Sequence, residues 1–376
     1  MVVSAFTSLL MALSIYLLAC RYFRFRRIRS IERKYRHVPL DQHKAQDICL
    51  VSDLYEMPYI LGMSSSFALF KTYGIPTISR LLVRTNQLAR LETAGRRAED
   101  TGVLISECLM NNIDSDRSRM CLARINYIHS LYRKRILNDD FLYTLSLFIF
   151  EPIRWTNKYE WRRCTSIEIE ARFVLWKEIG ERMGIENIPS TAKELEEWSL
   201  DYEEKHMIYT KDNQLCGEAT LALMLSIYPQ WMRSFVRKAF ICFIDERLRL
   251  AMGFEETPLW MKRLVATMVN IRAFLLRHCT LPRIFPDDRG QGPQSCVLNE
   301  AGRYQRKNYV FEPWYIKETW FNQFSPFVIQ RPGPKYRSEG FKPEELGPEQ
   351  YAGQGLEAMK KDVEKMKQRA TTPEKS

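Results

Sequence analysis

Apolar residues recur at helical spacing along most of the chain. From residue 96 onward they return every three or four positions in successive segments, as they do on one face of an α-helix. No convincing alternation of apolar and polar residues with a period of two occurs in this part of the sequence. The pattern therefore predicts an all-α fold. The predicted helices cover residues 96–113, 115–135, 139–150, 166–183, 191–207, 216–228, 234–252, 258–278 and 356–369.

Two of these predicted helices carry further signals. The helix over residues 115–135 follows Asp114 and Ser115, either of which is a suitable N-cap. The segment 139–150 is apolar all round and is followed by Pro152. About ten apolar residues are too few to span a bilayer. This segment therefore predicts a central, fully buried helix that ends at the proline.

An uncharged run opens the chain. Residues 2–20 contain no charged side chain, and at about 1.5 Å per residue they form a helix of about 28 Å, close to the ~30 Å hydrocarbon core of a bilayer. A cleaved signal peptide has its positive charges before the apolar run and a small-residue cleavage site after it. Here the charges follow the run, so the sequence predicts one uncleaved transmembrane helix.

Basic residues are concentrated directly after this run. Residues 21–40 carry seven of the eleven net positive charges of the chain. Because Lys and Arg stay on the cytoplasmic side of a membrane, we expect a cytosolic body, with the arginines from Arg21 to Arg29 against anionic lipid headgroups. The remaining chain has only a small charge excess, so we predict a membrane partner and no nucleic acid.

Missing motifs exclude several enzyme classes. The chain has 16 glycines among 376 residues, and it contains neither the dinucleotide-binding nor the phosphate-binding glycine pattern. It also lacks C-x-x-C, H-E-x-x-H and G-x-S-x-G, and no cysteine stands in the setting of a P450 thiolate. The nine cysteines are scattered singly, which is typical of reduced thiols in the cytosol.

Changes of composition divide the chain into five predicted parts. They are a transmembrane anchor at 1–20, a basic juxtamembrane segment at 21–40, a helical catalytic domain at 41–285, an aromatic-rich segment at 286–331 that wraps on the helices, and a C-terminal tail at 332–376.

His129 is the histidine whose setting best suits chemistry. The other four lie in charged or basic segments, whereas His129 lies within a predicted helix, close to Arg124, Tyr132 and Arg133. Nearby positive charge disfavours the imidazolium form, and a neutral imidazole can ligate a metal or a haem iron. The alternative is an ordinary packed and hydrogen-bonded histidine.

Two acidic motifs also have both a functional and a structural interpretation. Asp139 and Asp140 precede the buried helix and are either acid–base groups or the N-cap and favourable charges of its first turn, which we expect. The segment 245–249 is either a carboxylate pair for a metal or, as we expect, a solvated helix face.

Aromatic and basic residues raise the same question elsewhere. Trp155, Trp161 and Trp176 belong to the core or to the wall of a haem pocket. The helix at 259–278 either rests on the membrane or packs in the core, and we expect core packing. Its basic residues are Lys262, Arg263, Arg272 and Arg277.

With these residues in view, the chain resembles the fungal ER-bound oxygenases of the mycophenolic acid pathway, the MpaB type. These enzymes share a catalytic domain with the bacterial latex clearing proteins, which are rubber oxygenases. The resemblance rests on the order and spacing of several short motifs after the N-terminal anchor. They are Phe67-Ala-Leu-Phe-Lys-Thr-Tyr-Gly-Ile-Pro-Thr-Ile-Ser79, Arg124-x4-His129-Ser-x-Tyr132, Asp140-x-Leu-Tyr-Thr-Leu145, Glu160-Trp-Arg162, Asp245-x-Arg-Leu-Arg249 and Gly347-Pro-x-x-Tyr351.

The resemblance implies a single multi-helix oxygenase domain behind an N-terminal anchor in the endoplasmic reticulum membrane. It also implies oxidation or cleavage of a C=C bond in a lipophilic prenyl or terpenoid-like intermediate of fungal secondary metabolism. The bacterial relatives use haem b and have a proximal histidine where this chain reads Asp140 to Leu145 without one. The resemblance therefore leaves His129 as the iron ligand, for haem b or for non-haem iron. Arg124, Tyr132 and Arg133 are then its neighbours, with Arg124 pairing with a haem propionate or a bound oxygen species.

Three hypotheses follow for the function. The first is a membrane-anchored oxygenase that depends on haem or iron. The second is a non-redox enzyme on the same scaffold, such as a cyclase or an acid–base catalyst that uses His129 or Asp140. The third is a membrane-tethered helical adaptor without catalysis.

Overall fold

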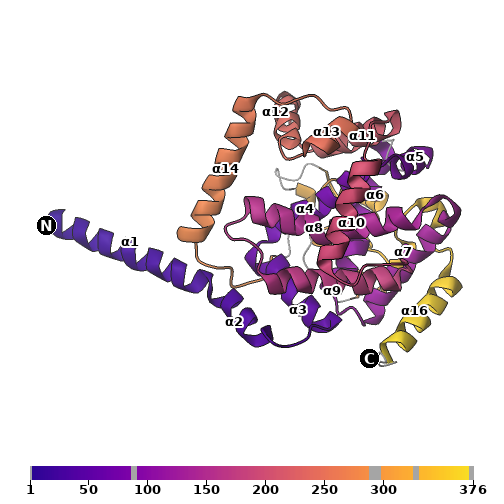
Figure 1. Ribbon diagram of the computed structural model, residues 1–376, viewed down its shortest axis with the longest axis horizontal. Coiled ribbons are helices and arrows are strands. Elements are labelled where there is room, and N and C mark those ends of the chain that lie inside the picture. The colour runs from indigo at the N-terminus through magenta and orange to yellow at the C-terminus, as the bar shows by residue number, and fades with distance from the viewer. Residues whose placement is uncertain (1, 86–90, 288–297, 325–329, 372–376) are drawn as a thin grey trace.

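A computed structural model describes residues 2–85, 91–287, 298–324 and 330–371 of the chain (Figure 1). Its α-helices are α1 Val2–Arg24, α2 Arg26–Tyr35, α3 Gln42–Val51, α4 Pro58–Thr72, α5 Pro76–Arg84, α6 Leu91–Met110, α7 Asp116–Ser130, α8 Asn138–Tyr159, α9 Ser166–Arg182, α10 Ala192–His206, α11 Lys211–Ser226, α12 Gln230–Ile241, α13 Glu246–Ala251, α14 Leu259–His278, α15 Trp320–Phe324 and α16 Leu356–Thr371. Short turns of other helix types are η1 Ser52–Glu56, η2 Arg133–Arg135, η3 Pro334–Tyr336, η4 Pro343–Glu345 and η5 Glu349–Tyr351. Over the described ranges, β-pairing is limited to two isolated bridges, so the predicted all-α fold is confirmed.

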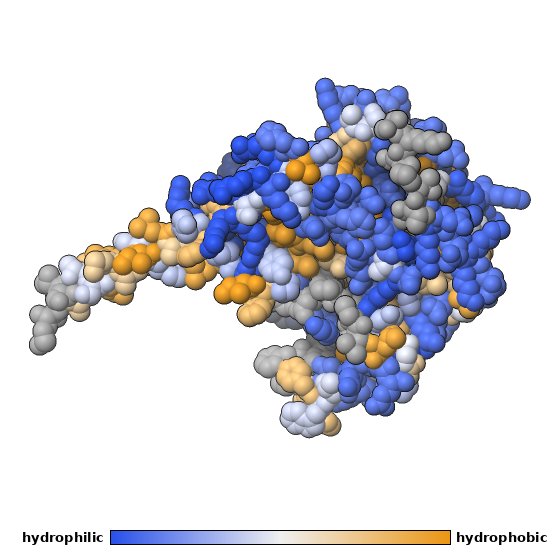
Figure 2. All heavy atoms as spheres, turned by 90° about the horizontal axis from the view of Figure 1, so that it is seen from below, coloured by the Kyte–Doolittle hydropathy of each residue, from blue (hydrophilic) through white to orange (hydrophobic). Residues whose placement is uncertain are grey.

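Helix α1 projects from the body as a stem that ends at the N-terminus (Figure 1). Figure 2 shows that this stem is hydrophobic, while the face of the body in the same view is mostly hydrophilic. Within the described part of the chain, the helical stretch Ala5–Tyr35 is the one that is long and apolar enough to cross a membrane. This agrees with the predicted N-terminal transmembrane helix.

The basic segment after the stem is divided between solvent and protein. Arg21 and Arg29 are exposed, as contact with headgroups requires. Arg24 is buried instead, and its guanidinium donates to the backbone oxygens of Thr280 and Leu281 at 2.9 and 3.2 Å. The expectation that every arginine from Arg21 to Arg29 faces the headgroups is therefore wrong for Arg24.

Helix α8 is the central element, as the unbroken apolar segment predicted. Leu147 and Ile149 are fully buried, and α4 and α9 pack against the helix. The predicted end at Pro152 is wrong, because α8 continues to Tyr159 with Pro152 inside it. A proline in a helix interior removes one backbone hydrogen bond and costs about 3 kcal/mol. Burial of the next turn, including Trp155, offsets this cost.

Polar caps determine where several helices begin. Thr165 forms a capping box with Glu168 at the start of α9. The predicted single helix over 234–252 is wrong, because the helix is interrupted between the end of α12 at Ile241 and the start of α13 at Glu246. Asp245 is the N-cap of α13, where its side chain accepts the Leu248 N–H at 2.9 Å. Asp245 and Glu246 are both exposed, and Glu246 pairs with Arg249 at 2.6 Å, so the expected solvated helix face is observed, with Asp245 as its N-cap.

The segments that follow α14 return to the helical body at α6. Glu99 accepts the backbone N–H groups of Val310 and Phe311 at 2.9 and 2.6 Å and pairs with Arg306. Asp100, which is fully buried, accepts the hydroxyl of Tyr315 at 2.7 Å. Two adjacent carboxylates thus hold the aromatic-rich segment, while α16 packs on α7. The proposed domain boundaries themselves stay predictions.

Candidate active site

His129 lies in the last turn of α7, where its ring packs against α8. The helix begins at Ser115, whose side chain accepts the Ser118 N–H at 3.2 Å, so one of the two expected N-caps is observed. The ring centroids of His129 and Phe141 are 5.1 Å apart. The Nδ1 atom of His129 is buried and has no hydrogen-bond partner. Buried polar atoms are nearly always paired, so this nitrogen is a candidate ligand atom.

The imidazole of His129 is neutral at physiological pH. Burial lowers the pKa of His129 to about 4, and the positive charge of Arg97 on α6 adds to the effect. The sequence predicted a neutral ring, but it attributed the shift to Arg124 and Arg133 on the same stretch. The structure instead gives burial as the main cause and brings the charge from another helix. A neutral imidazole has a lone pair on one of its two nitrogens, and Nδ1, which has no partner, is the candidate for it.

Tyr132 follows His129 by one turn and joins the C-terminal segment to it. The hydroxyl oxygens of Tyr132 and Tyr351 are 3.1 Å apart and share a hydrogen bond. Burial and this contact raise the pKa of Tyr132 to about 12, so its phenol is protonated at neutral pH. A protonated phenol is a potential proton or hydrogen-bond donor to a bound molecule.

Arg133 completes this corner of the molecule. Its exposed guanidinium lies 5.7 Å from the ring centroid of Phe141, the same ring that packs against His129. A hollow of about 430 Å³ is lined by residues 130–135. The structure therefore brings His129 and Arg133 to the same aromatic ring, and Tyr132 lines the adjacent hollow.

Arg124 has a different environment from the other predicted site residues. It is fully buried, and its guanidinium donates to three backbone oxygens of the C-terminal segment. The acceptors are Leu346 O at 2.8 Å, Tyr351 O at 2.8 Å and Gln354 O at 3.0 Å. Arg124 thus fastens residues 346–354 to α7 and holds Tyr351 beside Tyr132. This geometry favours a positioning role over direct contact with a propionate or an oxygen species, which stays a prediction.

The Gly347-to-Tyr351 motif has a physical explanation in these contacts. Gly347 has a φ of +94°, which favours glycine, and a Cβ atom there would lie 2.7 Å from Cδ1 of Ile128 on α7. Its N–H donates to the buried Asp100 at 3.0 Å. The motif therefore lets the backbone lie directly on the helix that carries His129. The sequence alone does not connect this motif with His129, because the two are more than 200 residues apart.

Similarity to known proteins identifies the family to which this corner belongs. Residues 81–273, about half of the chain, match the catalytic domain described as ER-bound oxygenase mpaB/B'/rubber oxygenase. The ER-bound oxygenase mpaB' of Penicillium brevicompactum is 32% identical over 340 residues, which are 83% of this chain and 79% of the relative. The ER-bound oxygenase mpaB of Penicillium roqueforti is 32% identical over 64% of this chain and 88% of its own length.

The chain belongs to this oxygenase family. Its members carry the names of oxygenases, so the chain is an oxidoreductase. This agrees with the first of the three hypotheses. The matched region contains Arg124, His129, Tyr132 and Arg133, whereas Tyr351 lies outside it.

Two further motif residues of this oxygenase, Lys71 and Asp245, belong to one ion network. Lys71 on α4 is buried and lies 3.1 Å from Glu151, 3.0 Å from Glu203 and 3.3 Å from Asp245. These carboxylates raise the pKa of Lys71 above its usual value against the effect of burial. The lysine thereby joins α4, α8, α10 and the start of α13. We interpret this cluster as a structural ion network, since all its charges have partners.

Asp140 is likewise occupied by neighbours. It is buried and accepts hydrogen bonds from Thr77 at 2.7 Å and Tyr202 at 2.9 Å. The N-cap position of α8 is Leu137, without a side-chain cap. The expectation that Asp139 or Asp140 is the N-cap is therefore wrong, although both carboxylates lie in the first turn and favour the helix dipole.

The three tryptophans are buried, as expected of core residues. Trp176 stacks on Phe148 with ring centroids 4.6 Å apart, and Trp155 stacks on Phe243 at 5.5 Å. Trp161 donates to Glu56 O at 3.3 Å beneath Arg24. The first two belong to the main core, whereas Trp161 fills the junction with the stem. Their place in a haem-pocket wall stays a prediction.

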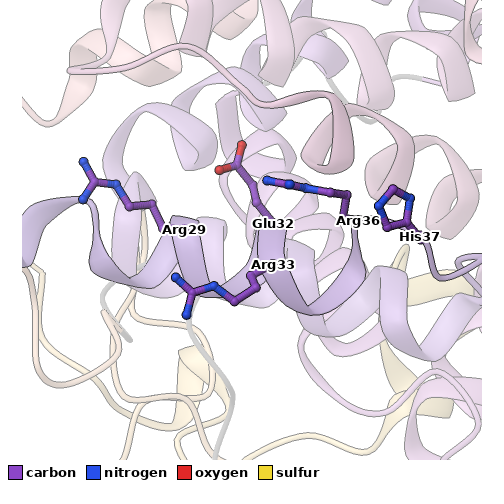
Figure 3. A pocket seen from close by; sticks show the side chains of 5 residues that line it. All are labelled: Arg29, Glu32, Arg33, Arg36 and His37. Atoms are coloured by element: carbon purple, nitrogen blue, oxygen red, sulfur yellow. The ribbon is translucent and has the colours of Figure 1, made fainter.

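A second hollow, of about 440 Å³, lies on α2 and the turn after it. Figure 3 shows Arg29, Glu32, Arg36 and His37 in a row along this helix, with Arg33 pointing away from them. Its lining is charged and close to the stem, so it suits lipid headgroups better than an apolar substrate.

The donor groups of this oxygenase suit one kind of iron centre better than the other. Among the described residues, no three His, Cys, Asp or Glu side chains come together as a metal-binding group. Non-haem iron in oxygenases needs such a set, so the described residues do not fit it. Haem iron needs one axial protein ligand, and the orphaned nitrogen of His129 fits that requirement.

Proposed function

We propose that this chain is an endoplasmic reticulum oxygenase of fungal secondary metabolism, anchored by α1 with its body in the cytosol. It oxidises or cleaves a C=C bond of a lipophilic, prenyl or terpenoid-like intermediate. Membership of the oxygenase family supports the reaction class. The apolar stem with its basic flank supports the anchor and its orientation.

The proposal assigns haem iron to His129. The observation that carries it is the buried Nδ1 atom without a hydrogen-bond partner, on an imidazole whose pKa is lowered to about 4. A neutral ring keeps its lone pair for a metal. A haem at this position supplies the oxygen chemistry, which the side chains of the protein alone do not perform.

The other residues of the corner support this chemistry without changing oxidation state. Tyr132, three residues after His129, supplies a phenol hydroxyl that is paired with the hydroxyl of Tyr351. Arg133 supplies an exposed positive charge that suits a propionate or an anionic substrate group. Arg124 keeps Tyr351 in position through its backbone oxygen. Phe141 covers the imidazole and keeps water from one side of the ring.

The test is an absorption spectrum combined with iron analysis of the full-length protein purified in detergent. Wild type is expected to show a Soret band and bound iron, and His129→Ala is expected to lose both. His206→Ala is the control, because His206 is exposed on α10 and packs on Tyr202. It should keep the spectrum. If wild-type protein is incubated with haem and retains no iron, the assignment is overturned.

Turnover tests the reaction class separately. Oxygen consumption with a prenylated phenol in detergent or nanodiscs should depend on His129 and persist in the His206→Ala control. Product formation without oxygen would instead favour the non-redox alternative.

A further inference from the structure

Helix α14 exposes an apolar stripe, contrary to the core packing that the sequence suggested. Met261 is the only residue of α14 with a buried side chain, whereas Trp260 is 59% and Met268 60% exposed. The exposed apolar residues follow one another at intervals of three or four positions, so they lie on one face of the helix. They are Trp260, Leu264, Met268, Ile271 and Leu275, with Phe274 beside them.

The rest of α14 is basic and contains no acidic residue. Lys262, Arg263 and Arg277 are exposed, while Arg272 pairs with Glu160 at 2.9 Å. A helix with an apolar face that carries Trp, Phe and Leu, and with Lys and Arg on its other side, is typical of helices that lie in a membrane interface. Ordinary surface helices turn their apolar face toward the core instead.

The C-terminal end of α14 is bound to the stem. The Tyr16 hydroxyl of α1 donates to Cys279 O at 3.1 Å. Arg24 donates to Thr280 O and Leu281 O, and Arg27 donates to Arg283 O at 2.9 Å. Figure 1 shows that α14 starts near α12 and ends beside α1, and that the two helices run in different directions. An α14 that lies along a membrane surface is therefore compatible with an α1 that crosses it.

The contact with Tyr16 also gives the depth of α14. Tyr16 precedes Arg21, the first charged residue after the apolar run, by five positions, which is a rise of about 8 Å along a helix. Interfacial helices bury their apolar face about 5–10 Å into the boundary between headgroups and acyl chains. The end of α14 thus lies at the depth at which its apolar stripe meets acyl chains.

The chain immediately after α14 extends the same surface. Ile284 and Phe285 are 81% and 80% exposed, and they follow the carbonyl groups that Arg24 and Arg27 hold. Apolar side chains held at this level have water on all sides unless a bilayer covers them. Figure 2 shows hydrophobic side chains on the body next to the base of the stem.

We propose that α14 and residues 281–285 form a second membrane contact, with the apolar stripe embedded in the leaflet nearest the body. The occupant of this surface is lipid, because the surface adjoins the apolar helix α1 and carries basic residues at its edge. This inference rests on the proposed anchor, since α1 defines the plane of the membrane. It gives the body a fixed orientation toward the bilayer, which a single stem does not provide.

The test measures contact between Trp260 and lipid in the full-length protein. The protein is reconstituted in nanodiscs whose phosphatidylcholine is brominated on the acyl chains, since bromine quenches tryptophan fluorescence on contact. The emission of Trp260 is the difference between wild type and Trp260→Phe, and we expect bromination to reduce it by about half or more, as for an interfacial helix. Trp198→Phe is the matched control, because Trp198 lies on α10 and stacks on Tyr202. The emission of Trp198, taken as the difference between wild type and Trp198→Phe, should be the same with and without brominated lipid.

A tryptophan placed in the stem separates failure of this inference from failure of the anchor. In Trp260→Phe/Phe6→Trp, the new tryptophan replaces a residue that is 60% exposed on α1 and should be quenched. Quenching at position 6 without quenching of Trp260 would overturn the α14 contact and leave the anchor intact. Absence of quenching at both positions would overturn both. A third outcome is that neither brominated lipid nor aqueous acrylamide quenches Trp260. Protein would then cover this surface, and the lipid assignment would be overturned.

Discussion

Two residues on the same helix show how hydrogen bonding separates a ligand from a structural clamp. His129 and Arg124 both lie on α7, and both are candidates for contact with a cofactor from sequence alone. Arg124 gives hydrogen bonds to three backbone oxygens, whereas Nδ1 of His129 has no partner. A buried group that is already satisfied gains little from a ligand, and an unsatisfied one gains much. The two residues therefore have different predicted effects when they are replaced.

Replacement of Arg124 should affect stability first. Arg124→Met removes the side-chain donor from three backbone oxygens. Tyr351 O keeps the N–H of Gln354 at 3.1 Å, and each buried acceptor left unsatisfied costs about 1–3 kcal/mol. We expect a loss of about 2 kcal/mol or more in the free energy of unfolding, measured by chemical denaturation of the full-length protein in detergent. Arg133→Met is the control, since its guanidinium is exposed and such changes stay within about 0.5 kcal/mol. Unchanged stability together with loss of haem would show that Arg124 contacts the cofactor after all.

Titration of His129 should make stability depend on pH. The folded pKa is about 4, against about 6.5 for an unfolded histidine. Between these values the unfolded chain binds a proton that the folded chain excludes, so the stability of the iron-free protein falls as pH decreases from about 6.5 to 4. The contribution of this residue is at most about 3 kcal/mol.

The comparison that isolates this effect is His129→Gln, which cannot titrate in this range. Melting temperatures of iron-free wild type and variant are measured from pH 7 to pH 4, and the wild-type curve should fall more steeply. Parallel curves would mean that the histidine is hydrated in the folded protein and that its pKa is near the ordinary value.

At the scale of elements, local signals in the sequence predicted the helices but not all of their boundaries. The helical spacing of apolar residues was sufficient for α8, α9 and α10, because this signal acts within one element. Pro152 was misleading, because contacts with other helices stabilise the last turns of α8 enough to offset the backbone hydrogen bond that the proline removes. The break before Asp245 was missed for a related reason, since the residue both caps α13 and faces Lys71 of a distant helix.

The candidate site was predicted in part for the same reason. His129, Tyr132 and Arg133 are neighbours in sequence, so their proximity at the end of α7 was predictable. Arg97 and Tyr351 come from 32 residues before and 222 residues after His129. Only the fold brings Arg97 close to His129 and Tyr351 into contact with Tyr132. The pair Glu99 and Asp100 is a sequence feature that could have predicted where the aromatic-rich segment docks. Two adjacent carboxylates on a helix need partners from another segment when they are buried.

Two helical glycines test the packing between elements. In α9, a Cβ atom at Gly180 would lie 2.6 Å from Cδ2 of Leu145 on α8, whereas a Cβ atom at Gly102 in α6 would meet no atom within 4 Å. Gly180→Ala should therefore destabilise the protein by about 1–3 kcal/mol. Gly102→Ala should stabilise it by about 0.5–1 kcal/mol, because alanine is the better helix former.

Both variants are compared with wild type by denaturant unfolding under the same conditions. Opposite signs would support close packing of α8 on α9 at Gly180. Equal stabilisation by both changes would instead show that Leu145 moves aside without cost.

At the scale of the whole molecule, the basic segment after the stem has two separate tasks. Arg24 and Arg27 hold the end of α14 against the stem through backbone oxygens, so their charge is used inside the protein. Arg21, Arg26 and Arg29 are exposed and remain available to anionic lipid. The sequence shows only a run of positive charge, whereas the fold separates the arginines that join α1 to α14 from those that remain exposed.

The exposed arginines should determine the orientation of the molecule in the membrane. The chain contains no Asn-x-Ser or Asn-x-Thr glycosylation site, so an acceptor site added at either end reports which end enters the lumen. In the wild-type background we expect glycosylation at the N-terminal end and none at the C-terminal end, because Lys and Arg remain in the cytosol. Changing Arg21, Arg26 and Arg29 to glutamine should give a mixed population with some C-terminal glycosylation. Arg24→Gln removes one charge from the joint and should leave the orientation unchanged while it weakens the contact between α1 and α14. Glycosylation of the C-terminal site in the wild-type chain would place the body in the lumen and contradict the cytosolic orientation.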